Sequence, residues 1–491
     1  MCGIIAYVGN SLAYPLLVKG LERLEYRGYD SAGIATINAI SNGNVVLKSL
    51  DITKVVGKVK NLHNNHLPGM IGIAHTRWAT HGSPTQANAH PHHNEDKSIA
   101  LVHNGIIENY DKLKKMLIEN DYSFYSETDT EVLVNLIDFH NKQNTNFISA
   151  LKCALSDVIG AYGVVVLNKE ENRLYAARKG SPLVLGIGDN EMFLASDPSA
   201  FVDRTRRVLY LEDNDIVVAG NNGYYLTNLS DHKECENRAV THINWDLKSI
   251  GKNGHETFMI KEIKEQTESL KNCIAGRIDL DNSTAKITVD VSEAFLKGVK
   301  KIFIAACGTS WHAALVGKFI IEKYCRIPVE VDYASEFRYK DPIIGKDDLF
   351  VVISQSGETA DTLAALREAK EKGAKTVGII NVVGSTIARE VDSGIYIHAG
   401  PEIGVASTKA FTGQVLCLNL LMVYLGRMRH TLNSETANAI LNNLVKLPEQ
   451  ISRIFKDEEK IMKIAQSLTE EKSCFFLGRG VNFPTALEGS L

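Results

Sequence analysis

The sequence lacks the cysteine, charge and targeting patterns that would assign it to a specialised class of protein. Its eight cysteines form no CxxC pair, which argues against a disulfide framework and a zinc site, and we expect reduced thiols. The net charge of −4, without any block of basic residues, gives no reason to expect nucleic acid as a partner. The N-terminus has neither the charged nor the apolar region of a signal peptide.

Long apolar runs are also missing. The longest, Val415 to Leu425, is too short to span a bilayer and contains Asn419, so no membrane is expected. The remaining composition is ordinary for a globular protein, with 44% apolar and 23% charged residues. A length of 491 residues is enough for two to four domains. We expect a soluble, cytoplasmic protein.

Residues 1–240 place short strands in clusters, with few helices between them. This order predicts stacked sheets rather than a βαβ repeat. Apolar residues at helical spacing predict helices at 110–120 and 127–139. The strands expected in this part are 71–75, 99–103 and 163–167.

Residues 232–254 are polar, show little periodicity and are typical of a linker. The order of predicted strands and helices changes after them. Short β-rich runs are then mostly followed by helices, which predicts a doubly wound parallel α/β sheet. Such sheets bind ligands at the carboxyl ends of their strands. The strands expected here are 301–306, 329–331, 349–353, 376–380 and 394–398.

The residues from Cys474 to Leu487 repeat the pattern of Ile302 to Leu315, a strand followed by a glycine turn and a helix. We therefore expect the chain to end inside a second, incomplete copy of the same domain. The predicted boundaries are 1–240 for the first domain, 241–253 for the linker, 254–431 for the second domain and 432–491 for the start of its copy.

Cys2 is the first candidate for chemistry. Removal of Met1, which processing favours before a small side chain, would leave a thiol and a free α-amine on one residue. The amine has a reference pKa near ~8 and can serve as the base that the thiol needs. A buried strand starting at Gly3 would hold this residue inside the fold.

Four further clusters are rich in polar residues and lie at the ends of predicted elements: Glu25–Gly33, His75–Gly82, His103–Ile106 and Ser126–Glu131. Each also has an ordinary structural explanation. Asp129 is equally expected as an acid in the first turn of a helix, and Asn104-Gly105 as a hairpin turn.

Three histidines, His90, His92 and His93, could be read as metal ligands. No carboxylate or cysteine spacing supports that interpretation, and Pro91 favours a plain loop. We expect no metal here.

Taken together with Cys2, the clusters resemble the class II glutamine amidotransferases, the N-terminal-nucleophile family with an αββα fold, over residues 2–240. The resemblance implies that Cys2 attacks the carboxamide of glutamine while its own amine relays the proton through water. It implies that Asn104 and Gly105 hold the oxyanion, where the loss of one donor typically costs ~10²–10³ in rate. Arg77 would grip the carboxylate of glutamine, and Asp129 its ammonium. The other residues implied to shape, gate or close the glutamine site are Trp78, Thr80, His81, Arg27 and Gly28.

In the second half, two turns rich in hydroxyl groups follow predicted strands, at Cys307–Ser310 and Ser354–Thr359. Each leads into a helix, so hydroxyl and N–H groups converge as they do in phosphate sites. One such turn could be a simple helix cap, but two on one sheet favour a phosphate cradle. The lysine of a Walker motif is missing, so a nucleoside triphosphate is not expected. A third segment, Glu402–Thr412, also leads from a loop into a helix.

These motifs resemble sugar isomerase domains, and the order of the two domains resembles the glutamine–fructose-6-phosphate aminotransferase family over essentially the whole chain. The resemblance implies transfer of the amide nitrogen of glutamine to fructose 6-phosphate, giving glucosamine 6-phosphate and glutamate, without a cofactor. This is the first step of the hexosamine pathway. The residues implied to hold the sugar phosphate are Thr309, Ser310, Ser354, Gln355, Ser356 and Thr359, with Val405 and Ala406 lining the sugar. An internal ammonia channel, controlled in part by Trp78, and a homodimer where the second sugar domain is complete are implied as well.

Two features depart from the family pattern. Thr267 stands where the family usually has proline. The isomerisation base, the ring-opening histidine and the Schiff-base lysine of the family fall beyond Leu491, and Glu488 matches a position just short of that base. We therefore expect this chain to hydrolyse glutamine but to make little or no glucosamine 6-phosphate.

Two other functions stay open at this point. A sugar-phosphate-binding regulatory module with a glutaminase fold would bind the sugar while Cys2 stayed chemically silent. Another class II amidotransferase, such as one that makes phosphoribosylamine, would need a buried strand ending in paired acids and threonines, and the sequence lacks one.

Overall fold

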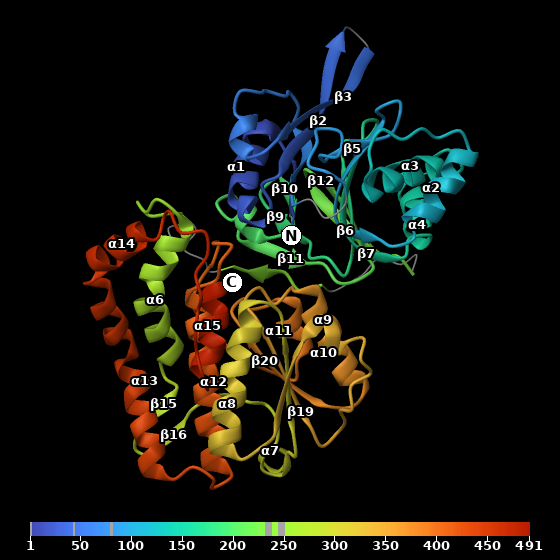
Figure 1. Cartoon of the computed structure of the whole chain (residues 1–491). Coiled ribbons are helices and arrows are strands. Elements are labelled where there is room, and N and C mark those ends of the chain that lie inside the picture. Colours follow the sequence, from blue (N-terminus) through green and yellow to red (C-terminus); the bar gives the residue numbers. More distant parts are fainter. Residues whose placement is uncertain (1, 43–44, 79–81, 145, 231–237, 244–250) are drawn as a thin grey trace. The chain divides into compact units, whose positions relative to one another are not determined.

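The computed structural model describes residues 2–42, 45–78, 82–144, 146–230, 238–243 and 251–491 (Figure 1). The chain divides into two compact units, residues 1–250 and 251–491, called unit one and unit two below. Much of the predicted linker lies outside the described residues. Its residues Thr241–His242 form strand β14, which pairs with β11 in a sheet of unit one, so this part is not a free connection.

Unit one contains two antiparallel sheets, as the clustered strands predicted. Over the described residues, one sheet has the order β14-β11-β9-β10-β1-β4-β2-β3 and the other β13-β12-β8-β7-β6-β5. The strands of the first sheet are β1 (Gly3–Val8), β2 (Ser31–Asn42), β3 (Val45–Val56), β4 (Ile71–Arg77), β9 (Val184–Ile187), β10 (Met192–Ala195), β11 (Arg207–Tyr210) and β14 (Thr241–His242). Those of the second are β5 (His92–His93), β6 (Ile99–Ile107), β7 (Gly160–Asn168), β8 (Leu174–Lys179), β12 (Asp215–Gly220) and β13 (Gly223–Asn228).

Helices cover the outer faces of the two sheets. Helix α1 (Ala13–Leu24) lies on the first sheet, and α2 (Tyr110–Glu119), α3 (Asp129–Asn141) and α4 (Phe147–Ser156) lie on the second (Figure 1). Short 3₁₀ turns occur at η1 (Glu25–Arg27), η2 (Val59–Leu62) and η3 (Pro198–Ala200). This is the predicted αββα layering.

Strand β1 explains how the start of the chain is held. Its alternate residues Ile4, Ala6 and Val8 join the apolar cluster between the two sheets. Ile5 lies on the opposite face, where its side chain meets Gly20 of α1. Because successive side chains of a strand point to opposite faces, a strand covered on both sides needs a continuous apolar run. All six residues of β1 are buried, and the residue before them is thereby fixed.

Unit two is built on a five-stranded parallel sheet with the order β18-β17-β19-β20-β21 among the described residues. The strands are β17 (Ile302–Ala306), β18 (Val329–Tyr333), β19 (Leu349–Ser354), β20 (Lys375–Ile380) and β21 (Ser393–Tyr396). The helices are α6 (Phe258–Ile274), α7 (Glu293–Gly298), α8 (Thr309–Cys325), α9 (Ala334–Phe337), α10 (Ala360–Glu371), α11 (Thr386–Glu390), α12 (Lys409–Met428), α13 (Ser434–Phe455), α14 (Glu458–Ser467) and α15 (Asn482–Ser490). A short hairpin, β15 (Ile278–Asp279) with β16 (Thr284–Ala285), follows α6.

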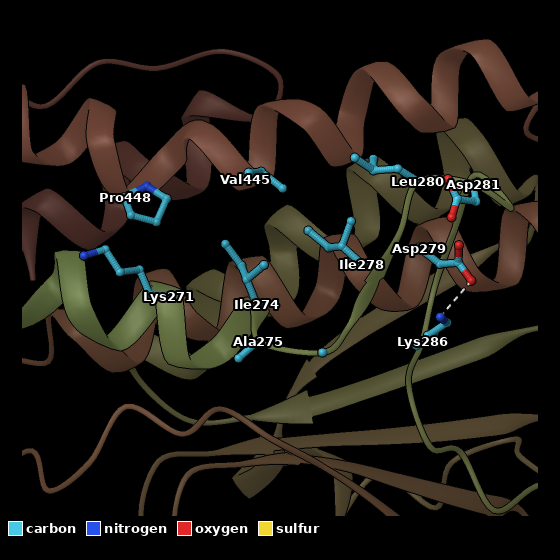
Figure 2. A pocket seen from close by; sticks show the side chains of 11 residues that line it. Lys271, Ile274, Ala275, Ile278, Asp279, Leu280, Asp281, Lys286, Val445 and Pro448 are labelled. Atoms are coloured by element: carbon cyan, nitrogen blue, oxygen red, sulfur yellow. Dashed lines mark ion pairs between the residues drawn. The ribbon is translucent and has the colours of Figure 1, made fainter.

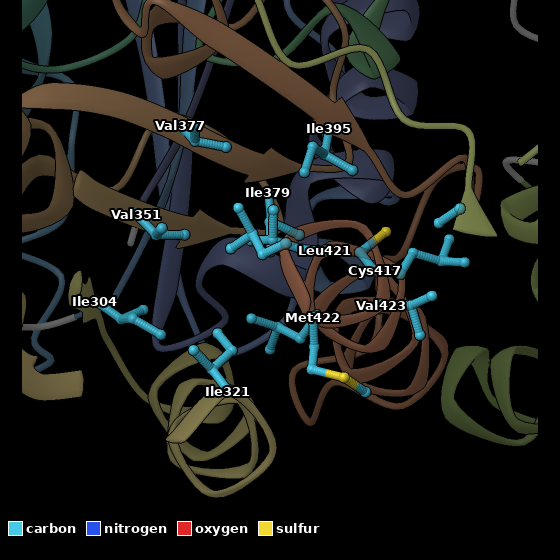
Figure 3. Packing of buried hydrophobic residues seen from close by; sticks show 14 of the residues in the cluster. Ile304, Ile321, Val351, Val377, Ile379, Ile395, Cys417, Leu421, Met422 and Val423 are labelled. Carbon is cyan, nitrogen blue, oxygen red and sulfur yellow. The ribbon is translucent and has the colours of Figure 1, made fainter. Parts of the chain in front are cut away.

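Both faces of the parallel sheet are covered, which confirms the doubly wound prediction. One face packs on α8 and α12, where Ile304, Val351 and Ile379 of the strands meet Leu421 and other residues of α12 (Figure 3). The other face packs on α9, α10 and α11. The chain moves from β17 to β18 on one side and then to β19 on the other side of β17. The carboxyl ends of β17 and β19 therefore form the switch point at which such sheets bind ligands.

Helix α12 is longer than the apolar stretch noted in the sequence. By length and composition alone its 20 residues could cross a membrane, but 72% of the apolar window is buried inside the protein. Burial of this kind is typical of the central helix of a globular domain.

The strand expected at the start of a second copy of the domain does not form, whereas the helix expected after it does. The residues expected as its first strand, 474–477, pair with no strand among the described residues, and Phe475 and Leu477 are 91% and 90% exposed. A strand is stable only beside a neighbouring strand, which explains the absence of regular structure here. The helix of the copy is present as α15, which packs against α8.

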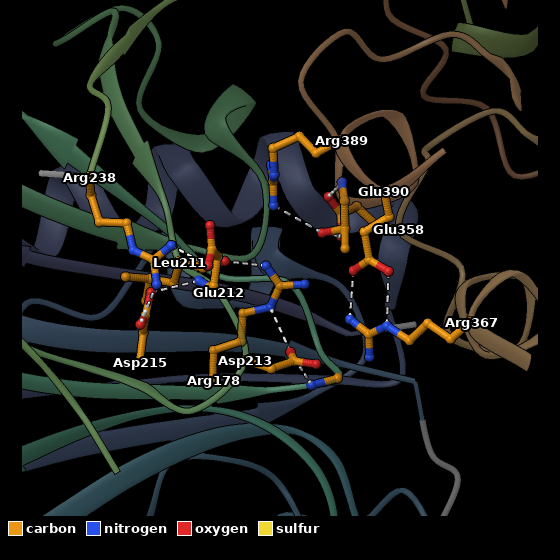
Figure 4. A network of polar contacts seen from close by, with 12 residues as sticks. Arg178, Leu211, Glu212, Asp213, Asp215, Arg238, Glu358, Arg367, Arg389 and Glu390 are labelled. Atoms are coloured by element: carbon orange, nitrogen blue, oxygen red, sulfur yellow. Dashed lines mark hydrogen bonds and ion pairs between the residues drawn. The ribbon is translucent and has the colours of Figure 1, made fainter. Parts of the chain in front are cut away.

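Arginine ion pairs hold loops in both units (Figure 4). In unit one, buried Arg178 donates to the carbonyl of Leu211 and pairs with Asp213, which ties β8 to the loop before β12. In unit two, Arg367 of α10 pairs with both oxygens of Glu390, at 3.0 and 2.7 Å, and fixes the end of α11.

Candidate active site

Cys2 lies directly before the central strand β1. The thiol Sγ accepts a hydrogen bond from the backbone N–H of Trp78 at 3.3 Å and lies 3.6 Å from the carbonyl oxygen of the same residue. Strand register explains the contact, because Gly3 pairs with Thr76 at the end of β4. Burial raises the pKa of the Cys2 thiol above its ordinary value. The thiol is therefore protonated near neutral pH and needs a base to become a nucleophile.

Asn104 of β6 lies on the other side of Cys2. Its side-chain Nδ2 donates to the carbonyl oxygen of Cys2 at 3.0 Å. Its Oδ1 lies 3.0 Å from Nε2 of His75. An amide oxygen can only accept, so this histidine donates from Nε2 and fixes which way the amide of Asn104 points. Burial lowers the pKa of His75 to about 3, so the ring is neutral over the working range of an enzyme.

Gly105 follows Asn104 in β6 and has a backbone φ of +135°. A Cβ at this position would lie 2.0 Å from the carbonyl oxygen of Ala161 and 3.0 Å from Nε2 of His103. Only glycine fits this approach. The Asn104-Gly105 pair is therefore part of a strand and not the tight hairpin turn that was the alternative; β6 continues to Ile107.

Arg77 and Asp129 carry the charges of the site. Asp129 is the first residue of α3, where one carboxylate oxygen accepts from the N–H of Ile107 at 2.9 Å. Arg77 ends β4, is buried, and donates to the carbonyl oxygens of Gly82 and Ser83 at 3.3 and 3.4 Å. A cation and an anion thus face one cavity from two different elements.

Helix α3 begins two residues later than the sequence predicted. Thr128 is its N-cap, because the Thr128 hydroxyl accepts from the N–H of Glu131 at 3.3 Å. Glu131 in turn accepts from the backbone N–H groups of Tyr125 and Ser126. These bonds fix the loop that carries Asp129.

Residues from all these elements line one small cavity of about 30 Å³: Cys2, Arg77, Trp78, His90, His103, Gly105, Thr128, Asp129 and Thr130. A single water molecule takes up about 30 Å³ of liquid volume. The described cavity therefore has room for little more than water beside the nucleophile. Trp78 both lines it and reaches solvent, with 38% of the residue exposed, and its ring meets the ring of Tyr29 edge-on at 5.3 Å.

Two other predicted residues lie outside the cavity lining. Arg27 is buried in an ion pair with Asp197, at 3.1 Å. The carbonyl oxygen of Gly28 accepts from the hydroxyl of Thr76 at 2.5 Å. A Cβ on Gly28 would lie 2.6 Å from the backbone of Arg77, so this loop packs tightly on the end of β4. Thr80 and His81 lie outside the described residues.

A group of buried histidines packs together beside the cavity, and one of them, His90, lines it. The rings of His75 and His90 stack at 4.1 Å, and His92 meets His90 edge-on at 4.9 Å. Burial lowers the pKa of all three. Within the described part of the chain no group of three His, Cys, Asp or Glu residues is arranged to hold a metal ion.

The second candidate site lies at the switch point of the parallel sheet. The first turn follows β17, where Gly308 has φ +53° and caps α8. Ser310 in the first turn of α8 accepts from the side-chain Nε2 of Gln414 at 2.9 Å, which joins α8 to α12. The hydroxyl of Thr309 donates to Oε1 of Glu488 in α15 at 2.9 Å.

The second turn follows β19 and folds back on itself. The hydroxyl of Ser354 accepts from the N–H of Gly357 at 2.9 Å and lies 3.3 Å from the hydroxyl of Thr359. Ser356 accepts from the N–H of Glu358 at 3.1 Å. Gln355 lies in the same turn with its side chain half-buried. Hydroxyl and N–H groups are thus concentrated here, as a phosphate requires.

Helix α11 holds this turn in shape. Both carboxylate oxygens of Glu358 accept from Thr386, one from its N–H and one from its hydroxyl, at 2.8 Å each. Gly357 has φ +67°, and a Cβ there would lie 1.9 Å from the hydroxyl oxygen of Ser385. The turn therefore needs glycine and depends on the start of α11.

Val405 and Ala406 lie in the loop before α12, and both are exposed, Val405 to 69%. Glu262 of α6 supports this loop by accepting from the N–H groups of Ile403 and Gly404, at 2.5 and 3.0 Å. Lys409, the first residue of α12, pairs with Glu265 of α6 at 2.7 Å.

Comparison with known proteins identifies a domain in each unit. A glutamine amidotransferase domain model matches residues 75–203, and a SIS domain model matches residues 295–424. The chain is 48% identical over 503 aligned residues to a glutamine–fructose-6-phosphate aminotransferase [isomerising] of Chlorobaculum tepidum, covering 100% of this chain and 80% of that protein. The protein of the same name from Bacteroides thetaiotaomicron is 47% identical with the same coverage.

The chain belongs to the glutamine–fructose-6-phosphate aminotransferase family. A solved C-terminal domain of the glucosamine–fructose-6-phosphate aminotransferase from Francisella tularensis is 36% identical, with a TM-score of 0.47, and covers 49% of this chain and 67% of that one.

Two histidines that contact candidate site residues were not singled out by the sequence. His75 begins one of the polar clusters, but its role in orienting Asn104 depends on a contact between β4 and β6. In unit two, His312 lies 2.6 Å from Glu488 through Nδ1, so that one carboxylate bridges His312 and Thr309. Helical spacing alone places His312 one turn after Thr309, which is the signal that could have identified it.

Proposed function

We propose that this chain carries out the reaction for which its relatives are named, including the transfer step that the sequence analysis expected to be weak or missing. It releases the amide nitrogen of glutamine at Cys2 and transfers it to fructose 6-phosphate, giving glucosamine 6-phosphate and glutamate. The observation that carries the proposal is the position of Cys2, before a buried strand, with Asn104 at its carbonyl and Arg77 and Asp129 around the same cavity.

The chemistry at Cys2 follows from its surroundings. The buried thiol is protonated, and the α-amine freed by removal of Met1 takes its proton through water. The sulfur then attacks the carboxamide carbon of glutamine, ammonia leaves, and water hydrolyses the thioester to glutamate. The tetrahedral intermediate carries a negative oxygen, which the Asn104 amide and the Gly105 N–H stabilise.

Substrate binding requires the cavity to open. A volume of about 30 Å³ cannot hold a glutamine molecule. Arg77, now bonded to the carbonyl oxygens of Gly82 and Ser83, exchanges these acceptors for the carboxylate of glutamine, since an arginine fork binds a carboxylate more strongly. Asp129 takes the ammonium. Trp78, Thr80 and His81 shape and gate the site, and the loop of Arg27 and Gly28 closes over the substrate.

The sugar phosphate binds at the switch point of unit two. The phosphate is held by Thr309, Ser310, Ser354, Gln355, Ser356 and Thr359, and the sugar lies against Val405 and Ala406. The hydroxyls of Ser354 and Thr359 now bond to each other or to backbone groups, so they turn toward the phosphate when it arrives. A regulatory module without catalysis is not favoured, because the relatives that match the whole chain are named as enzymes.

The proposal extends to the compartment, the domains and the assembly of the enzyme. The enzyme acts in the cytoplasm on two small soluble substrates, with no nucleic acid and no membrane. The amidotransferase domain spans residues 1–240, and the sugar isomerase domains begin at 254 and 432. The homodimer and the ammonia channel stay predictions.

The test is a paired assay on the purified chain with glutamine and fructose 6-phosphate, recording glutamate and glucosamine 6-phosphate. Cys2→Ala is expected to abolish glutamate release, a loss of more than about 10⁴-fold, because the nucleophile is removed. The matched control is Cys153→Ala, at an exposed cysteine of the same unit. Glutamate release that survives Cys2→Ala would overturn the assignment of the nucleophile.

A further inference from the structure

Two buried cysteines of unit two lie in direct contact. Cys273, in the last turn of α6, and Cys417, in α12, are both fully buried, and their sulfur atoms are 3.5 Å apart. Cys417 belongs to the apolar cluster between α12 and the parallel sheet (Figure 3). Their separation of 144 residues in the sequence means that a bond between them would close a long loop.

A cation faces both sulfur atoms. The Nη1 of Arg277, three residues beyond the end of α6, lies 3.9 Å from the sulfur of Cys273 and 3.8 Å from that of Cys417. A guanidinium next to a thiol favours the thiolate, which is the reactive form. The pKa of Cys273 is lowered, first by its hydrogen bond with Cys417 and also by the guanidinium. The second proton is then harder to remove, so the pKa of Cys417 is raised.

The end of α6 is also the wall of a pocket. A cavity of about 540 Å³ opens between this end, the hairpin after it and α13 (Figure 2). Lys271, Ile274 and Ala275, the chain neighbours of Cys273, line it. The pocket thus admits a small oxidant as far as Ile274, the residue next to Cys273 in the chain. The last turn of a helix is also where it opens most easily.

We propose that Cys273 and Cys417 form a reversible disulfide that links α6 to α12 when the protein meets a hydroperoxide. The modification is separate from the proposed transfer reaction and uses none of its residues.

The chemistry balances with hydrogen peroxide as the oxidant. The Cys273 thiolate attacks one peroxide oxygen; the S–O bond forms, the O–O bond breaks, and hydroxide leaves and takes up a proton as water. Cys417 then attacks the sulfenic sulfur; the S–S bond forms, the S–O bond breaks, and the hydroxyl leaves as water with the thiol proton. Two thiols are oxidised by two electrons, and one peroxide is reduced to two waters.

The geometry favours the second step, the attack of Cys417 on the oxidised sulfur of Cys273. A disulfide is about 2.05 Å long, so the sulfur atoms must approach by about 1.5 Å. Cys273 sits in the last turn of α6, where a helix opens most easily, whereas Cys417 lies two turns inside α12. The link would fix α6, whose Glu262 and Glu265 support the loop and the first residue of α12.

The experiment exposes the reduced chain to hydrogen peroxide, denatures it, alkylates the remaining thiols and maps the peptides without reduction. The expected result is a Cys273–Cys417 peptide that disappears with dithiothreitol. The exposed Cys153 serves as an internal reference for oxidation. The proposal is overturned if both buried cysteines are recovered alkylated at a peroxide dose that oxidises Cys153.

Two further measurements test the role assigned to each group. The oxidised chain should melt about 5 °C or more above the reduced chain, because the link restricts the unfolded state, and Cys273→Ala should abolish the rise. Arg277→Gln should slow formation of the linked peptide by about tenfold, through loss of thiolate. Lys271→Gln removes a positive charge from the same helix end without touching either sulfur and should leave the rate unchanged. Equal rates in the two variants would overturn the activation by Arg277.

Discussion

The two candidate sites of this chain are built in opposite ways. At Cys2, the functional groups come from β1, β4, β6 and α3, and side-chain hydrogen bonds such as that from His75 to Asn104 align them. At the candidate sugar-phosphate site, two continuous turns after neighbouring parallel strands supply the groups. The turn after β19 is held partly by bonds within itself, and bonds to α11, α12 and α15 support the two turns. A covalent reaction needs donors fixed at one developing charge, whereas a phosphate accepts hydrogen bonds from groups that follow one another in the chain.

The most direct test of this difference removes one aligned hydrogen-bond donor beside Cys2. Asn104→Asp keeps the size of the side chain but loses the amide N–H groups. We expect kcat for glutamate release to fall by about 10²–10³ with little change in KM, because the donor acts on the oxyanion of the transition state. Steady-state kinetics with glutamine measures both constants.

Asn120→Asp is the matched control for that variant. Asn120 is exposed at the end of α2 and donates to the backbone of Met116, away from the cavity. Its kinetics should match the unmodified chain. If Asn104→Asp instead raised KM without lowering kcat, the Asn104 amide would bind the substrate in its ground state and would not act selectively on the transition state.

The same contrast explains what the sequence could predict. The sugar-phosphate site follows from local patterns, because a strand, a hydroxyl-rich turn and a helix are contiguous in the chain. Topology then brings the turns after β17 and β19 together at the switch point. The position of Cys2 could also be predicted from the sequence, because a buried strand that starts at Gly3 fixes it.

The rest of the glutamine site depends on contacts that no local pattern reports. The role of His75 comes from a side-chain contact between β4 of one sheet and β6 of the other, and the ion pair of Arg27 with Asp197 joins residues 170 positions apart. The resemblance to a family supplied the roles of Arg77 and Asp129, which physical patterns left open. The strand at 474–477 was wrong because periodicity indicates a strand without showing whether a partner strand is present.

Acid is expected to lower the stability of unit one more than that of unit two. The stacked histidines of unit one are neutral in the folded state, and burial lowers the pKa of His75 to about 3, against about 6.5 for an unfolded histidine. Between these values the unfolded state binds more protons, so stability is complete above pH 6.5 and falls as the pH drops toward 3. For each such histidine, the free energy of unfolding falls by about 1.4 kcal/mol for every pH unit below this limit.

Thermal unfolding at pH 8 and pH 5 measures this difference. Unit one should lose more stability than unit two, where the pKa of His398 is lowered but no stack of buried histidines exists among the described residues. His75→Gln should reduce the pH slope of unit one, and His63→Gln, at an exposed histidine, should not. Equal acid sensitivity of the two units would contradict the argument.

The smallest expected effect concerns the local cradle. Glu358→Gln keeps the shape of the side chain but weakens its two bonds to Thr386 at the start of α11. A hydrogen bond to a charged group contributes about 1.5–3 kcal/mol, and partial loss should raise the Kd for fructose 6-phosphate by about tenfold. Calorimetric titration measures the affinity, with Glu371→Gln at the exposed end of α10 as the control. If the affinity of Glu358→Gln is unchanged, the turn after β19 keeps its shape without α11, and the cradle is even more local than its contacts indicate.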